Sequence, residues 1–144
     1  MLEEKLKELI DLYSPIDDAQ ERMTLIVDAA GRRPGGEPDG LRADANRVRG
    51  CVSAAWIAGR MEDGRCTFVC AADSPLVLGL LAALCGFYSG AEPREIASSP
   101  LDPLEALGLT RNLSPTRQNG LASARNRIRD LAQAWAQGDG SEAP

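Results

Sequence analysis

Apolar residues recur at helical spacing along the first part of the chain and predict two amphipathic helices. The first is expected over residues 2–13, and Ser14-Pro15 ends it. The second is expected from about residue 17 or 18, with acidic residues at its start and Arg32 and Arg33 near its end, which suits the helix dipole. The apolar positions of the two helices are Leu2, Leu6, Leu9, Ile10 and Tyr13, then Ala19, Met23, Ile26, Val27 and Ala30.

The middle of the chain changes to a pattern of short strands and turns. Residues 34–46 are rich in Gly, Pro and Asp and are typical of a loop. Asp63-Gly64 is a strong hairpin signal, because both residues tolerate a positive φ, so a strand is expected on each side. A third, shorter strand is expected to precede these two. Cys51, next to Gly50, would then lie in a tight turn between the first two strands. The expected strands are Asn46–Arg49, Val52–Met61 and Arg65–Ala71.

Three dipeptides mark helix starts in the C-terminal half of the chain. They are Ser74-Pro75, Asp102-Pro103 and Ser114-Pro115, and each joins a capping oxygen to a proline at the first helical position. The last helix is expected to run to about Gln137 and to end at Gly138, because glycine commonly terminates helices.

The order of two helices, then strands, then further helices predicts an α+β fold. We expect a three-stranded antiparallel sheet with helices packed on one face. The length of 144 residues suits one domain, which we place over residues 1–137, with residues 138–144 as a flexible C-terminal tail. A chain of this size buries roughly 68–70% of its unfolded surface, so it can form a core without metal or disulfides.

The composition argues against several classes of function. The net charge is −5 and the arginines alternate with Asp and Glu, so the basic patch of a nucleic-acid-binding protein is lacking. There is no histidine, which removes the usual general base and the commonest metal ligand. The longest apolar run, residues 75–88, is shorter than the about 20 residues that span a bilayer. Residues 1–10 do not resemble a signal peptide, so we expect a cytoplasmic protein with reduced thiols.

Cys51 is the leading candidate for chemistry among the four cysteines. It follows Arg47, Arg49 and Gly50, and nearby cations favour the reactive thiolate by lowering the pKa of a thiol. Strand alternation puts both arginines and Cys51 on one face, if the strand continues that far. The alternative is a small buried packing residue, which is the usual place of a free cysteine. The local pattern does not decide between the two interpretations.

The other three cysteines fit core packing better. Cys66 and Cys70 alternate with Phe68 on one strand face, and their Cα atoms would be about 13 Å apart, too far for a disulfide. Cys85 lies in an apolar predicted helix. A site built from all four cysteines would close a tetrahedral zinc shell, but the spacing resembles no zinc module. We therefore expect no metal on this chain.

Two charged residues outside the cysteine loop are candidates for binding. Arg117 lies in the first turn of the last predicted helix, where a cation opposes the helix dipole. It could pair with a carboxylate or a partner, and the alternative is a solvated arginine. Asp73 precedes the Ser74 cap, and its simplest role is loop solubility with support of the helix N-terminus.

Three segments of the sequence, in order, resemble the SufE family of sulfur-transfer proteins. Residues 49–56, Arg-Gly-Cys-Val-Ser-Ala-Ala-Trp, are similar to the family's Gly-Cys-x-Ser-x-x-Trp segment, in which the cysteine is the active residue. Residues 72–80 are similar to the stretch that opens the helix after the sheet, and residues 113–121 to the C-terminal signature. The resemblance extends over residues 1–137, and three ordered motifs are far more specific than one cysteine.

The resemblance implies that Cys51 accepts sulfur, as a persulfide, from a pyridoxal-phosphate cysteine desulfurase of the SufS-like or CsdA-like type and stimulates that enzyme. The sulfur would pass to an iron–sulfur scaffold complex of the SufBCD-like type, and the chain would need no cofactor of its own. Arg49, Gly50, Asp73 and Arg117 would contact the partner or stabilise the cysteine loop. The implied fold is the one shared with IscU-type scaffolds, and the implied state is a monomer or weak homodimer.

Two other functions stay open at this point. A metal- or cluster-binding scaffold of the IscU type would need several converging ligands, which without histidine would be cysteines and carboxylates. A pure interaction module would carry an inert Cys51. In the main interpretation the chain is a sulfurtransferase-like accessory protein and not an independent catalyst. Thiol exchange is compatible with this, because it needs an ionised thiol and no metal.

Overall fold

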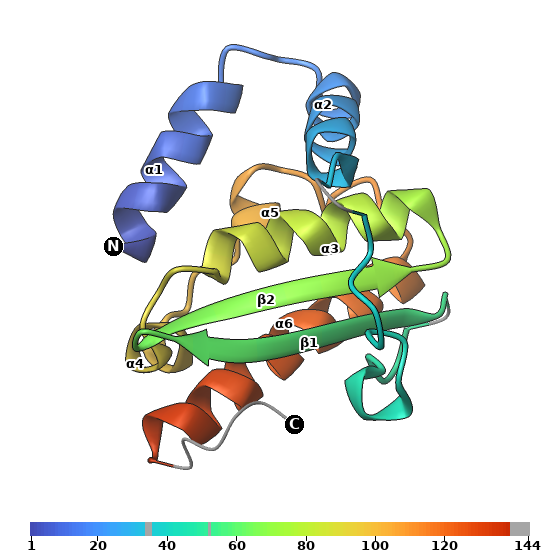
Figure 1. Cartoon of the computed structure of the whole chain (residues 1–144). Helices are drawn as coiled ribbons and strands as arrows, with labels where there is room; N and C mark the ends of the chain where they lie inside the picture. Colours follow the sequence, from blue (N-terminus) through green and yellow to red (C-terminus); the bar gives the residue numbers. More distant parts are fainter. Residues whose placement is uncertain (34–35, 52, 139–144) are drawn as a thin grey trace.

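The computed structural model describes residues 1–33, 36–51 and 53–138. A small sheet lies against two long helices, and a pair of N-terminal helices lies beyond them (Figure 1). The predicted C-terminal tail lies outside the described residues, apart from Gly138 at its start.

The sheet is an antiparallel hairpin of β1 (Ala55–Glu62) and β2 (Arg65–Ala72). The two strands pair in continuous register along their whole length. The turn is Asp63-Gly64, and its φ angles are 53° and 78°. Positive φ at both central positions is the geometry of a type I′ turn, which matches the twist of the strands. The hairpin prediction is therefore confirmed.

The prediction of a third strand over Asn46–Arg49 is wrong, although the α+β class is confirmed. This segment makes one isolated bridge to β1 through Arg47, and the Val48 N–H donates one hydrogen bond to β1 at 2.9 Å. A 3-10 turn, η1 (Asp44–Asn46), includes the first residue of the segment, and Gly50 turns the chain directly after it with a φ of 79°. Two turns this close together leave too few residues for a ladder, so the sheet of the described part of the chain has two strands.

One face of the hairpin is buried under α3 (Pro75–Tyr88) and α6 (Pro115–Ala136). Phe68 of β2 stacks on Trp135 of α6, with ring centroids 5.9 Å apart. Gly59 leaves room for this contact, because a Cβ atom there would lie 2.9 Å from both rings. The inward-facing residues of the two strands, each at most 7% exposed, are Ala55, Ile57, Cys66, Phe68, Cys70 and Ala72.

The two predicted N-terminal helices are present as α1 (Leu2–Tyr13) and α2 (Ala19–Gly31). Asp18 caps α2 by accepting a hydrogen bond from the helix backbone, as its position before the helix predicts. α2 packs against α3 at Gly79, where a Cβ atom would lie only 2.5 Å from Val27 Cγ1. Glycine is therefore what allows the two helices to approach this closely.

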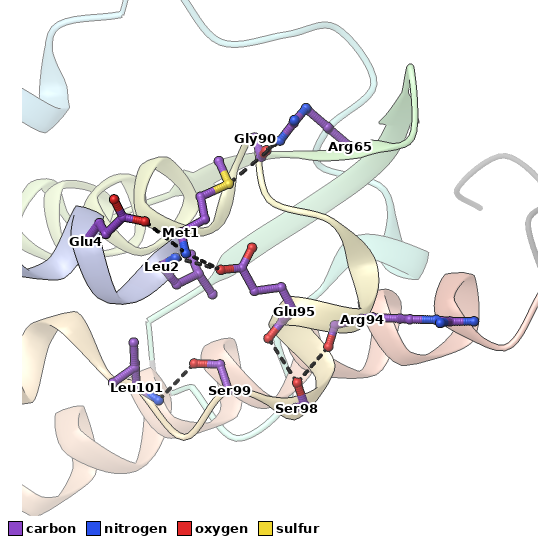
Figure 2. Close-up of polar contacts among 10 residues, drawn as sticks. All are labelled: Met1, Leu2, Glu4, Arg65, Gly90, Arg94, Glu95, Ser98, Ser99 and Leu101. Carbon is purple, nitrogen blue, oxygen red and sulfur yellow. Dashed lines mark hydrogen bonds and ion pairs between the residues drawn. The ribbon is translucent and has the colours of Figure 1, made fainter.

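The first turn of α1 is anchored on α4 (Pro93–Ser98), a short helix that the sequence pattern did not predict (Figure 2). The Leu2 N–H donates to Glu95 Oε2 at 2.6 Å, and the Leu2 side chain is buried. Arg65, at the start of β2, donates to the Gly90 carbonyl at 2.8 Å in the loop that leads to α4. The Leu2–Glu95 bond thus joins the start of the chain to α4, and the Arg65–Gly90 bond joins β2 to the loop before α4.

The three predicted helix starts are confirmed by their caps. Ser74 caps α3, Asp102 caps the short helix α5 (Pro103–Ala106), and Ser114 caps α6, each by accepting a backbone N–H. The last helix ends just before Gly138, whose φ is 80°. Among the described residues, no helix combines the length and the apolar character needed to cross a membrane.

Candidate functional site

Cys51 lies in the loop that leads into β1, where that loop rests on α6. Gly50 precedes it with a φ of 79°, in the left-handed region that glycine adopts without strain. A Cβ atom on Gly50 would also lie 3.1 Å from Ser123 Oγ on α6. The turn expected beside Cys51 is thus present, and it leads into a half-buried position for the thiol.

The thiol of Cys51 is seated against Gly120 of α6. A Cβ atom at position 120 would lie 3.1 Å from Cys51 Sγ and 3.5 Å from both Cys51 Cα and Cys51 Cβ. A side chain of any size would therefore press on the cysteine. Glycine inside a helix costs about 1 kcal/mol relative to alanine, and the close approach of Cys51 gives a physical reason for it here.

A pocket of about 180 Å³ opens beside the Cys51 thiol, between the starts of α3 and α6. Its apolar residues come from both helices, and its polar residues include Arg117, which the sequence singled out as a candidate. The structure thus brings Arg117 and Cys51 to one pocket, although they are far apart in the chain. The lining residues are Cys51, Ser53, Val77, Leu80, Leu81, Ser114, Thr116, Arg117, Gly120 and Leu121.

Replacing Gly120 by alanine is expected to displace the Cys51 side chain without unfolding the protein. An added methyl group in a well-packed contact costs about 1–3 kcal/mol, while alanine in a helix gains about 1 kcal/mol over glycine. We expect the alkylation of Cys51 by iodoacetamide to become about tenfold faster, the change that about 1.4 kcal/mol produces. The control is Gly86→Ala in α3, where a Cβ atom meets nothing within 4 Å. Equal alkylation rates in the two variants would contradict the close contact between Cys51 and Gly120.

Asp73 does not line the pocket but ties together the base of the cysteine loop. Its N–H donates to the Ala54 carbonyl at 3.0 Å, and its carboxylate accepts from Arg42 at 2.7 Å. Arg42 also pairs with Glu37 at 2.9 Å, and this hydrogen bond holds the pKa of Glu37 below its usual value. The sequence did not single out Arg42, because its contact with Asp73 joins positions 31 residues apart.

Replacing Asp73 by alanine is expected to loosen this tie with little loss of stability. The variant keeps its backbone bond to Ala54 and loses one exposed ion pair, which contributes about 0–1 kcal/mol. We expect the midpoint of urea unfolding to change slightly and the alkylation of Cys51 to accelerate less than in Gly120→Ala. If Asp73→Ala exposed the thiol more than Gly120→Ala does, the helix contact would not be the main restraint.

The arginines upstream of Cys51 separate in the structure. Arg47 stacks on Trp56 with its guanidinium carbon 5.5 Å from the ring centre, and Arg42 lies 4.7 Å from the same ring. These are cation–π distances, so both arginines fix the indole at the start of β1. Arg49 is exposed on the cysteine loop. Strand alternation does not place Arg47, Arg49 and Cys51 on one face, because this segment makes one isolated bridge and no strand.

The other three cysteines are buried, with exposed fractions of 0% for Cys66, 2% for Cys70 and 3% for Cys85. Burial raises the pKa of Cys66 to about 11, so this thiol stays protonated and inert at neutral pH. Within residues 1–33, 36–51 and 53–138, His, Cys, Asp and Glu side chains form no group of three or more that could hold a metal ion.

The chain matches a family model over residues 7–132, that of the SufE "Fe-S metabolism associated domain". The chain therefore belongs to the SufE family.

Two relatives match along most of their length. The chain is 32% identical over 133 residues to an uncharacterized SufE-like protein of Rhizobium meliloti, covering 89% of this chain and 94% of that protein. It is 30% identical over 115 residues to the sulfur acceptor protein CsdE of Escherichia coli, covering 78% of each chain.

A solved structure has the same fold. It is the solution structure of a hypothetical protein from Thermus thermophilus, with a TM-score of 0.72 over 92% of this chain and 96% of that one. The two sequences are 21% identical.

Proposed function

We propose that this chain is a sulfur acceptor of iron–sulfur metabolism that carries sulfur as a persulfide on Cys51. The donor would be a pyridoxal-phosphate cysteine desulfurase of the SufS or CsdA type, with the persulfide on its own cysteine. Family membership and the likeness to a sulfur acceptor protein support the proposal. The observation that carries it is the half-buried Cys51 thiol, seated on Gly120 beside a pocket of about 180 Å³.

The proposed transfer is a thiol exchange. The Cys51 thiolate attacks the terminal sulfur of the donor persulfide, and a new S–S bond forms at Cys51. The S–S bond on the donor breaks, and the donor cysteine leaves as a thiolate. The terminal sulfur keeps its proton and its oxidation state throughout. The step therefore needs no metal and no external oxidant, which fits a chain without histidine.

The pocket beside Cys51 has room for the extra sulfur. An apolar cavity of about 150 Å³ in another protein holds a benzene molecule, which is far larger than one sulfur atom. Walls formed by Val77, Leu80, Leu81 and Leu121 would keep water-borne thiol reductants away from the persulfide. To meet a donor enzyme the thiol must leave this seat, and the turn at Gly50 is the natural hinge because glycine changes φ at low cost.

The proposed effect on the donor enzyme and the proposed sulfur acceptor both fit a carrier with one exchangeable sulfur. The chain would stimulate the desulfurase by removing its persulfide, and would then pass the sulfur to a SufBCD-like scaffold complex. It would act in the cytoplasm, as a monomer or weak homodimer, and would not be an independent catalyst. Arg49 on the loop and Arg117 at the pocket would face the partner, because both are exposed.

Incubation with a cysteine desulfurase and excess cysteine tests the proposal. We expect the intact mass of the chain to rise by one sulfur, about 32 Da, and peptide mapping to place the sulfur at Cys51. The persulfide is captured with iodoacetamide before digestion, so that its position is preserved. No adduct, or an adduct at Cys66, Cys70 or Cys85, would overturn the proposed role.

A further inference from the structure

Cys70 and Cys85 meet in the core, although they belong to different elements. The Phe68 N–H donates to Ser89 Oγ at 3.0 Å, which fixes the end of α3 beside the middle of β2. α3 then lies along β2 (Figure 1). Cys85 lies one turn before Ser89, about 6 Å along the helix and on the same face. Cys70 lies two positions beyond Phe68, about 6.6 Å along the strand and on the same side. Because the two steps match, Cys70 and Cys85 lie at the same level of the packed strand and helix, and both are buried in one apolar core.

The surroundings of these thiols differ from those of Cys66. The neighbouring Cys85 thiol lowers the pKa of Cys70 against the opposing effect of burial, and the Cys70 thiol together with burial raises the pKa of Cys85. The Arg33 guanidinium donates to the Cys70 carbonyl, and its charge favours the thiolate at both cysteines, against the opposing charge of Glu37 at Cys70. Arg33 is thus a cation beside Cys70 that favours the thiolate, the reactive form of a cysteine. For Cys66, burial is the one cause of the raised pKa, with no contribution from a second cysteine or from an arginine.

We propose that Cys70 and Cys85 form a redox-active dithiol that hydrogen peroxide closes into a disulfide joining β2 to α3. In the first step the Cys70 thiolate attacks one peroxide oxygen, the O–O bond breaks, and hydroxide leaves, which gives a sulfenic acid on Cys70. In the second step the Cys85 sulfur attacks the Cys70 sulfur, the S–O bond breaks, and water leaves with the Cys85 proton. The two thiols lose two electrons, and the peroxide is reduced to two molecules of water.

Burial sets which oxidants reach this dithiol. The two thiols are 2% and 3% exposed, so a water-sized peroxide can reach them during small fluctuations, while a bulky maleimide cannot. The bond would cross-link a strand to the helix that follows it, which restricts the unfolded chain. We expect the oxidised form to melt roughly 5–10 °C higher than the reduced form.

Peroxide treatment of a Cys51→Ser variant tests the proposal. This background removes the thiol of the proposed carrier, so the outcome is independent of sulfur transfer. We expect a mass loss of about 2 Da, one free thiol after denaturation, and a linked peptide pair that contains Cys70 and Cys85. A thiol reductant should reverse all three changes.

Further variants in the same background identify which two cysteines form the disulfide. Cys66→Ala should leave the 2 Da loss unchanged, and Cys70→Ala and Cys85→Ala should each abolish it. Circular dichroism checks that each variant folds. If one of Cys70→Ala and Cys85→Ala does not fold, the other is sufficient for the test. The proposal is overturned if Cys70 and Cys85 stay unlinked under peroxide until urea unfolds the chain, or if Cys66 supplies one half of the disulfide.

Discussion

Replacing Cys51 by alanine is expected to abolish the stimulation of a cysteine desulfurase by this chain. Without the acceptor thiol, the donor persulfide can be released only by reductant in solution. Alanine formation from cysteine should therefore fall to the rate of the desulfurase alone. Because Cys51 is half-buried in a loop and not in the apolar core, the fold should survive its replacement. The rates are measured at equal concentrations of desulfurase, with a fixed concentration of dithiothreitol.

The matched control is Cys66→Ala, because Cys66 is fully buried and its thiol has a pKa of about 11. This variant should stimulate the desulfurase as the unmodified chain does, since its thiol takes no part in exchange. Full stimulation by Cys51→Ala would mean that docking alone activates the donor. Loss of stimulation in both variants would point to a general loss of folded protein.

The largest effect on stability is expected at Gly79. A Cβ atom there would lie 2.5 Å from Val27 Cγ1 and 2.9 Å from Val27 Cα, so the backbone of α2 would have to move away from α3. Overpacking costs about 1–3 kcal/mol, and contact with backbone places Gly79→Ala at the upper end. After the gain of about 1 kcal/mol in helix propensity, we expect a net loss of about 2 kcal/mol in the free energy of unfolding.

Urea unfolding of Gly79→Ala and Gly86→Ala gives the comparison. Both substitutions lie in α3, but a Cβ atom at Gly86 meets nothing within 4 Å, so Gly86→Ala should be slightly stabilised. The melting temperature of Gly79→Ala should fall by about 4–8 °C, given about 2–4 °C for each kcal/mol in a chain of this size. If the two variants unfold at the same urea concentration, α2 does not rest on α3 as the structure shows.

Local signals predicted most of the elements, because each acts within a few residues. Ser74, Asp102 and Ser114 cap their helices with their own side chains, and Asp63-Gly64 turns the hairpin through its own φ angles. Such features depend little on the rest of the fold. The sequence could therefore place the helix starts and the hairpin before any packing was known.

The errors lie where short segments depend on their neighbours. The expected strand over residues 46–49 has one β-branched residue, Val48, and η1 and the turn at Gly50 leave the segment one bridge to β1. Residues 93–98 form α4 where the chain packs on α6 with Ile96 fully buried, and six residues are too few to show a helical period. In the first case the adjoining turns decide the outcome, and in the second a distant helix does.

Cys51 and Arg117 could be selected as site residues from sequence, but their surroundings could not. Gly120 is significant only because Cys51 rests on it, and a glycine within a helical pattern gives at most a hint of close approach. The proximity of Cys70 and Cys85 likewise depends on the packing of α3 on β2, which the sequence does not show. Along β2 alone, Cys70 alternates with Cys66, and this pattern indicates core packing for both.

Single-turnover transfer from a loaded donor tests the role of Cys51 most directly. The desulfurase is first charged with cysteine and freed of excess substrate, and the chain is then added while the masses of both proteins are followed. We expect the donor to lose about 32 Da as this chain gains it, and we expect no gain in Cys51→Ser. A donor that keeps its sulfur in the presence of the unmodified chain, or a Cys51→Ser variant that still gains it, would contradict a sulfur carrier based on this thiol.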